Sequence, residues 1–141
     1  MKRVVIDSNI LFSALIRDSH TRRVVIEYRG IFLVPSFVFN EIEEHKNELL
    51  EKSGMTNGVF HELLKILSSK LEIVPPKMLF PFIGKAYELG KYIAPDDSPF
   101  IACALAYPES LIWSDDKRLK KQQVINVLNT REFSRWIKEK P

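Results

Sequence analysis

The sequence has few of the residues that build disulfides or zinc sites. Cys103 is the single cysteine, so no disulfide can form within the chain, and a cysteine-based zinc site would lack its second thiol. The small apolar neighbours of Cys103 indicate a buried side chain. The histidines His20, His45 and His61 show no spacing typical of metal ligands. These absences exclude a disulfide scaffold, argue against zinc and fit a reducing interior.

Long apolar runs, low-complexity segments, internal repeats and glycine/serine linkers are also missing. The apolar run that ends at Asp7 is far too short for a signal peptide or a membrane span, so we expect a cytoplasmic protein with no membrane partner. A length of 141 residues, with 45% hydrophobic and 28% charged residues, is ordinary for one folded domain. We therefore expect a single domain over residues 1–141.

Short apolar strands alternate with helical patterns along the chain. This alternation predicts a three-layer α/β fold with a mostly parallel sheet. The expected strands cover residues 3–7, 31–34, 71–74, 111–113 and 124–128. The expected helices cover residues 9–16, 21–28, 37–52, 56–69, 79–92 and 98–106, followed by a short basic helix from Lys117 and a last helix capped by Thr130. Gly30 is expected to close the second helix as its C-cap, and Ser36 to cap the third.

Acidic residues stand where expected strands end or expected helices begin. They are Asp7, Glu41, Asp96, Asp97, Asp115 and Asp116. Ligand sites in open α/β sheets form at the carboxyl ends of the strands, so we expect Asp7, Glu41, Asp97 and Asp116 to converge there. Converging carboxylates repel one another, and a hard cation such as Mg²⁺ or Mn²⁺ relieves that repulsion. A cation beside a phosphodiester can activate water and stabilise the leaving oxygen.

Each of these acids has a simpler interpretation when it is taken alone. Residues 7–9 and 96–98 have good helix-capping chemistry. Asp116 is well placed to favour the dipole of the basic helix that follows it. Glu41 could pair with a surface lysine. Four such positions in one small chain nevertheless favour a common site over four unrelated caps and ion pairs.

Positive charges gather close to the last acids. The net charge of +3 by itself only permits an anionic partner. The cations nearest Asp116 are Lys117, Arg118, Lys120 and Lys121, and a second group near the C-terminus comprises Arg131, Arg135, Lys138 and Lys140. We interpret the first group as a contact surface for RNA phosphates, with a solvated helix face as the alternative.

Five segments stand in order across nearly the whole chain: VVIDSNILFSAL, VPSFVFNEIEEH, PDDSPFIACALA, LIWSDDKRL and VINVLNTREF. Together they resemble the PIN-domain family, including its VapC-like ribonucleases, whose motifs follow the same order. The resemblance implies an α/β/α sandwich with a central parallel sheet and Mg²⁺- or Mn²⁺-dependent cleavage of RNA. It implies catalytic roles for Asp7, Glu41, Asp97 and Asp116. It implies metal binding by Asp7, Asp97 and Asp116, with Asp96 and Asp115 as secondary candidates and with support from Ser8, Asn9 and Ser114.

The resemblance also implies partners and leaves alternatives open. RNA is the expected substrate, and an antitoxin protein and a second copy of the chain are expected partners. A toxin and an RNA-processing nuclease both fit, and a non-catalytic RNA- or protein-binding PIN module is the alternative function. A phosphatase-like hydrolase fits less well, because Asn9 stands where a second Asp would act as general acid. The chain departs from the family at Arg118, where many members carry a further acid.

Overall fold

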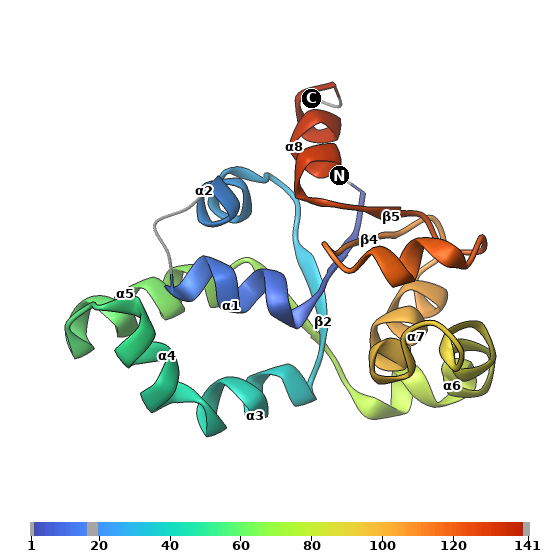
Figure 1. Ribbon diagram of the computed structural model, residues 1–141, viewed down its shortest axis with the longest axis horizontal. Coiled ribbons are helices and arrows are strands. Elements are labelled where there is room, and N and C mark those ends of the chain that lie inside the picture. Colours follow the sequence, from blue (N-terminus) through green and yellow to red (C-terminus); the bar gives the residue numbers. More distant parts are fainter. Residues whose placement is uncertain (1, 17–19, 140–141) are drawn as a thin grey trace.

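Five short parallel strands form one sheet at the centre of the molecule. The computed structural model describes residues 2–16 and 20–139 (Figure 1). The strands are β1 (Val4–Ile6), β2 (Phe32–Pro35), β3 (Leu71–Val74), β4 (Leu111–Trp113) and β5 (Val127–Leu128), in the spatial order β3-β2-β1-β4-β5. Every neighbouring pair is parallel, so the expected parallel sheet is confirmed. Strands β1, β2 and β4 are buried along their whole length, as their continuous apolar sequences require.

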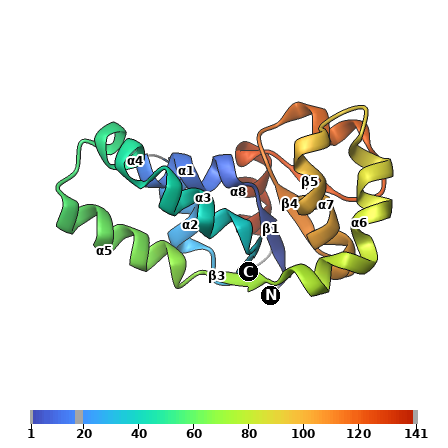
Figure 2. The ribbon, with the colours of Figure 1, turned by 90° about the horizontal axis from the view of Figure 1, so that it is seen from below.

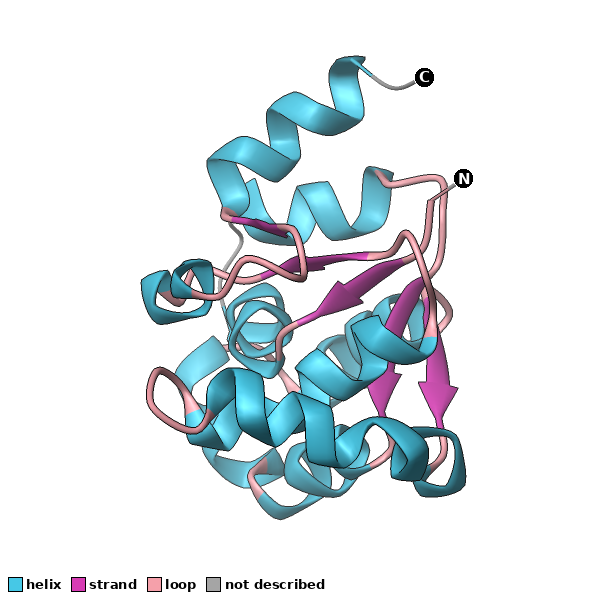
Figure 3. Cartoon of the chain, turned by 90° about the vertical axis from the view of Figure 1, so that its right-hand side faces the viewer, coloured by secondary structure: helices cyan, strands magenta, loops and turns pink. Residues whose placement is uncertain are grey.

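Helices cover both faces of this twisted sheet (Figure 3). The first group comprises α1 (Ser8–Ile16), α2 (His20–Glu27), α3 (Phe37–Glu44), α4 (Lys46–Ser53), α5 (Asn57–Ser68) and α8 (Thr130–Glu139). The second group comprises α6 (Pro76–Gly90) and α7 (Ser98–Ala106). Two 3-10 helices, η1 (Pro95–Asp97) and η2 (Lys117–Lys121), complete the elements. Figure 2 shows α1 to α5 on one side of the sheet and α6 with α7 on the other. The predicted α/β/α sandwich is therefore confirmed.

An aromatic cluster joins α8 to the sheet. The ring of Trp113 on β4 stacks on that of Phe133, with 4.5 Å between centroids, and Phe133 stacks on Trp136 at 5.6 Å. Trp113 is fully buried, and its indole Nε1 donates to Thr130 Oγ1 at 3.0 Å. Cys103 is also buried, as expected, and burial raises the pKa of its thiol to about 12. Among residues 2–16 and 20–139, no helix combines the length and the apolar character that a membrane crossing requires.

Two predicted elements differ from their apolar patterns: one helix is divided into two, and one strand is shorter. The helix expected over residues 37–52 is divided at His45, where φ is −102° and ψ is 13°, into α3 and α4. The strand expected over residues 124–128 is reduced to β5. The side chain of Gln122 causes this, because its Oε1 accepts from the backbone N–H groups of Val124 and Ile125 and so satisfies them outside the sheet.

Three predicted caps are also wrong. Ser36 has helical dihedrals itself (φ −58°, ψ −30°) and its side chain caps nothing. Asn129, not Thr130, caps α8: its Oδ1 accepts from the N–H of Glu132 at 2.8 Å, and its own N–H donates to Glu132 Oε1 at 2.9 Å. Gly30 does not adopt the left-handed conformation of a C-cap. A Cβ at Gly30 would instead lie 2.7 Å from the ring of Tyr28, so the close approach of that ring requires glycine.

Replacing Gly30 by Ala is expected to destabilise the fold by about 1–3 kcal/mol, the usual effect of overpacking a core. Tyr28 cannot move aside easily, because its ring is buried against Phe32 and its hydroxyl donates to the carbonyl of Lys2. Gly84 in α6 provides the control, since a Cβ there meets nothing within 4 Å. Urea titrations of both variants measure the effect, and Gly84→Ala is expected to match or exceed the parent's stability. Equal stability of Gly30→Ala and Gly84→Ala would contradict the steric explanation.

Candidate active site

A hydrogen bond between Asp7 and Ser114 forms the centre of the site. Asp7 follows β1 and Ser114 follows β4, and neighbouring parallel strands end at the same edge of the sheet. Ser114 Oγ donates to Asp7 Oδ2 at 2.6 Å, and both residues are buried. The same Oγ accepts from the backbone N–H of Asp116 at 3.1 Å. One hydroxyl therefore links the acids that follow two different strands.

Asp7 also serves the helix that follows it. Its Oδ1 accepts from the N–H of Asn9 at 3.4 Å, in the first turn of α1, which begins at Ser8. The capping interpretation and the site interpretation of Asp7 therefore both apply. Burial raises the pKa of Asp7, the hydrogen bonds from Ser114 and Asn9 oppose that rise, and the negative charge of Asp116 adds to it.

Asp97 reaches the same edge from a helix start. A helix between two parallel strands runs back against them, so the N-terminus of α7 lies at the carboxyl ends of the strands. Burial raises the pKa of Asp97 to about 7, and the negative charges of Asp7 and Asp116 act in the same direction. Its Oδ2 is buried and has no hydrogen-bond partner. Asp97 is thus the acid of the group that least favours ionisation.

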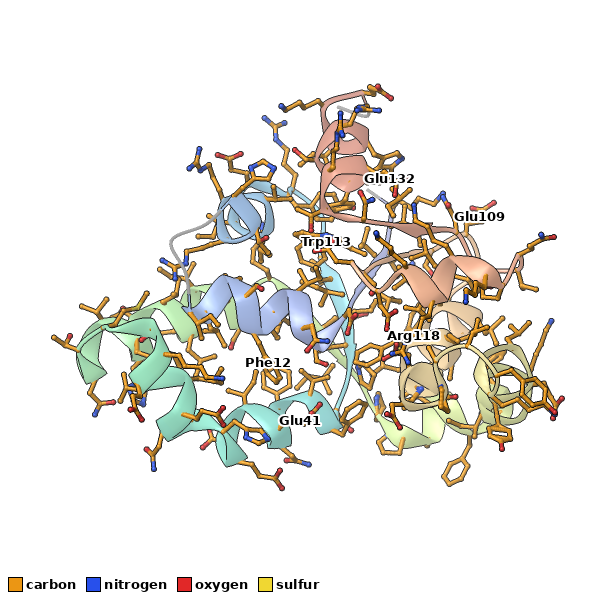
Figure 4. The ribbon with its side chains drawn as sticks, in the orientation of Figure 1. Phe12, Glu41, Glu109, Trp113, Arg118 and Glu132 are labelled. Atoms are coloured by element: carbon orange, nitrogen blue, oxygen red, sulfur yellow. The ribbon has the colours of Figure 1, made fainter. Side chains whose placement is uncertain are left out.

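Glu41 comes from α3, one turn after that helix begins. Figure 4 shows it on the part of α3 that faces α1. Its Oε1 is buried without a hydrogen-bond partner. Burial raises the pKa of Glu41, and the charge of Asp7 contributes in the same direction. The structure therefore brings Asp7, Asp97 and Asp116 together and places Glu41 within electrostatic reach of Asp7.

Asp116 differs from the other acids because an arginine neutralises it. Arg118 donates from Nε to Asp116 Oδ1 at 3.0 Å and from Nη2 to Oδ2 at 2.7 Å, and its backbone N–H donates to Oδ1 at 3.0 Å. Hydrogen bonding to Arg118 holds the pKa of Asp116 below its usual value, although burial opposes this. The positive charge of Arg118 also acts on Asp97. Figure 4 shows the side chain of Arg118, which belongs to η2, on the side of η2 that faces α7.

The two secondary candidates occupy different positions. Asp96 lies exposed in η1, and its charge acts on Arg118. Asp115 binds Thr130 instead, accepting from its N–H at 2.7 Å and from its Oγ1 at 2.9 Å. Asp115 still borders an open hollow of about 350 Å³, which is lined by Asp7, Asn9, Ile10, Ser13, Asp115 and Asp116. Asp115 therefore anchors α8 beside the site.

The acids suit a hard cation by their chemistry, although they are not arranged as a complete set of metal ligands. Within residues 2–16 and 20–139, no three His, Cys, Asp or Glu side chains are already arranged as a set of metal ligands. The donors are nevertheless carboxylate oxygens, which Mg²⁺ and Mn²⁺ prefer. Glu41 Oε1 and Asp97 Oδ2 are buried acceptors with no partner, as free ligand positions would be. Arg118 supplies the positive charge beside Asp116.

The predicted RNA-contacting cations lie in η2, directly after Asp116. Lys120 pairs with Glu132 of α8, and Lys117 and Lys121 are exposed. A second hollow of about 620 Å³ opens beside this segment and is lined by Ser114, Asp115, Asp116, Lys117, Lys120, Asn129 and Arg131. The sequence pattern alone assigns neither Asn129 nor Arg131 to this site. The available signal was that Asn129 directly follows β5 and Arg131 lies two residues further on, because β5 also ends at this edge.

Asp97→Asn is expected to stabilise the metal-free protein at pH 8 and to have a smaller effect at pH 5. The folded state raises the pKa of Asp97 from its ordinary 3.8 to about 7, so its contribution to stability is present at acidic pH and is lost as the pH rises through 7. Removing the charge is expected to recover on the order of 1–3 kcal/mol at pH 8. Melting temperatures in chelator measure this, with the exposed neighbour substitution Asp96→Asn as control. A gain for Asp97→Asn that is the same at both pH values would contradict the electrostatic origin.

Comparison with known proteins agrees with the order of the sequence motifs and with the fold. A search of curated protein sequences found no match to the chain. A family model described as the PIN domain matches residues 5–135, which begin within β1 and include the other four strands. The match includes Asp7, Glu41, Asp97 and Asp116 and ends within α8. The chain therefore belongs to the PIN-domain family.

Proposed function

We propose that this protein is an Mg²⁺- or Mn²⁺-dependent endoribonuclease that hydrolyses RNA phosphodiester bonds. PIN domains are generally nucleases, they usually use divalent metal ions, and they commonly bind RNA. One observation carries the proposal for this chain. Asp7, Asp97 and Asp116 come from three distant segments to one edge of the sheet, and Glu41 faces them from a fourth. Burial, and to a lesser extent the charges of neighbouring acids, raises the pKa of Asp7, Glu41 and Asp97, and such raised values are common where carboxylates serve a functional site.

Each carboxylate has a role in the proposed chemistry. Asp7, Asp97 and Asp116 would hold the cation, which when bound neutralises charge on the phosphodiester and activates water. Ser114 orients Asp7 and fixes the backbone of Asp116 through its two hydrogen bonds, so the two carboxylates keep their relative positions. Glu41 Oε1 is an acceptor without a partner, and we assign it the hydrogen bond from the attacking water.

Arg118 gives the site a second state. Its guanidinium binds both oxygens of Asp116, a geometry that competes with a cation for the same carboxylate. If Asp116 held a cation, Arg118 would be released beside the site and could pair with a substrate phosphate. Because 56% of the Arg118 side chain is exposed, this release costs little.

The same ion pair favours the second candidate function, a PIN module that binds RNA without cutting it. A permanently neutralised Asp116 would leave the site one ligand short. The roles of toxin, with an antitoxin partner, and of RNA-processing nuclease both stay predictions, as do the homodimer and the cytoplasmic location. Metal binding separates the catalytic function from the non-catalytic one.

Asp7→Asn is expected to lower Mn²⁺-dependent cleavage of single-stranded RNA by about 100-fold or more, since even loss of a group that only orients a metal ligand costs up to about that much. Asn keeps the acceptor for Ser114 but loses the negative charge. A fluorescent RNA with a quencher measures the rate, and Glu41→Gln is expected to behave similarly. Glu62→Gln, an exposed residue of α5, is the matched control for Glu41→Gln. Full activity of Asp7→Asn with an unchanged melting temperature would place the chemistry elsewhere.

Arg118→Gln is expected to bind Mn²⁺ several-fold more tightly than the parent, because the competing cation has been removed from Asp116. Isothermal titration without RNA measures this affinity. Lys121→Gln removes the same charge from the same 3-10 helix and is the control. Equal affinities for the parent and Arg118→Gln would show that the ion pair does not compete with metal. If neither protein binds Mn²⁺ at millimolar concentration, the non-catalytic function is correct.

A further inference from the structure

A third hollow, which is positively charged, adjoins the hollow of about 620 Å³ beside η2. It measures about 570 Å³ and is lined by His20, Thr130, Arg131, Ser134, Arg135 and Lys138. Arg131 lines both hollows, so they meet at that side chain. This third hollow lies between the start of α2 and α8, which Figure 1 shows as neighbouring helices. An extended groove therefore runs from the acids at the sheet edge along α8.

The positive charges of this groove follow the periodicity of α8. Arg131, Arg135 and Lys138 are spaced by four and three residues, so they lie on one face of the helix, and all three are exposed. The opposite face packs inward, with Phe133 fully buried. Of the described residues that line the third hollow, three are Arg or Lys and none is Asp or Glu. The lining of this hollow is therefore cationic, and the nearby Glu132 of α8 interacts electrostatically with Arg135.

Two of the four cations of η2 are already held in ion pairs. Arg118 binds Asp116, and Lys120 pairs with Glu132. Arg131, Arg135 and Lys138 have no ion pair among the described residues. Beside Lys117 and Lys121, the α8 face therefore adds three positive charges that an anion can contact without first breaking an ion pair.

We propose that the groove holds the phosphates of a single RNA strand, which leads from the acid cluster along Arg131, Arg135 and Lys138. This proposal rests on the proposed nuclease function and adds the path of the substrate. Arg131 to Lys138 span about 10 Å at 1.5 Å per helical residue. Stacked nucleotides at about 3.4 Å each would cover that length with about three phosphates. The strand therefore extends at least about three nucleotides beyond the scissile bond on one side.

Binding of a 12-nucleotide single-stranded RNA, followed by fluorescence anisotropy in chelator, tests the groove without relying on cleavage. Arg135→Gln/Lys138→Gln is expected to weaken binding and to lower the slope of log affinity against log salt by about 1.4, or about 0.7 for each phosphate that the protein no longer neutralises. Lys77→Gln/Lys85→Gln removes two exposed charges from α6, on the other side of the sheet, and is the matched control. Equal effects of the two double variants would overturn the proposal, because net charge alone would then explain them.

Two further arms separate this proposal from the nuclease function and from a different ligand. RNAs extended by three nucleotides on the 5′ or the 3′ side of the cleavage point are expected to gain affinity on one side only, and the α8 double variant is expected to lose that gain. If no RNA is cleaved but the salt slope still falls, the nuclease function fails and the groove remains. If an acidic peptide of equal charge binds as tightly as RNA and loses affinity equally in the α8 double variant, the groove is a protein-binding surface and the proposal is wrong.

Discussion

The parallel pairing of β1 with β4 is the constraint on which the site depends. The register places Ile6 opposite Trp113, so the next residues along the two strands, Asp7 and Ser114, leave the sheet side by side. Their side chains then form a hydrogen bond between residues 107 positions apart in the sequence. The backbone supports the same junction, since the N–H of Asp7 donates to the carbonyl of Trp113 at 3.1 Å. A shift of register by one residue would turn these side chains to opposite faces of the sheet.

Charge balance is the second constraint. Four carboxylates near one another are costly in the absence of a cation, and the chain reduces that cost in two ways. Asp97 favours protonation, because burial and its acidic neighbours raise its pKa, while Asp116 stays ionised against Arg118. The two responses follow from exposure: Arg118 reaches Asp116 from solvent, whereas Asp97 Oδ2 is buried. The acids are thus held at some cost to stability, as expected where residues serve function.

Helix α8 connects the acid cluster to the cationic groove. Thr130 binds Asp115 through both its N–H and its hydroxyl and accepts from Trp113, while Asn129 and Glu132 form a reciprocal cap. These bonds set the direction in which the helix leaves β5, and the buried ring of Phe133 sets its rotation. The cationic face points into the groove as a consequence. Asp115, a secondary metal-ligand candidate in the sequence, therefore has a structural role in the fold.

The local pattern of the sequence determined the strands, most of the helices, the placement of acids at strand ends and the family. These depend on apolar periodicity and on residue order, which a single chain carries without knowledge of contacts. Only the tertiary structure decided which partners the polar side chains bind. Arg118 pairs with Asp116, Asp115 with Thr130, and Gln122 with the backbone that would have lengthened β5. It likewise decided that Gly30 makes room for the ring of Tyr28. Each of these outcomes depends on the distances, the burial and the competing partners around a side chain, and these exist only after the strands and helices have packed.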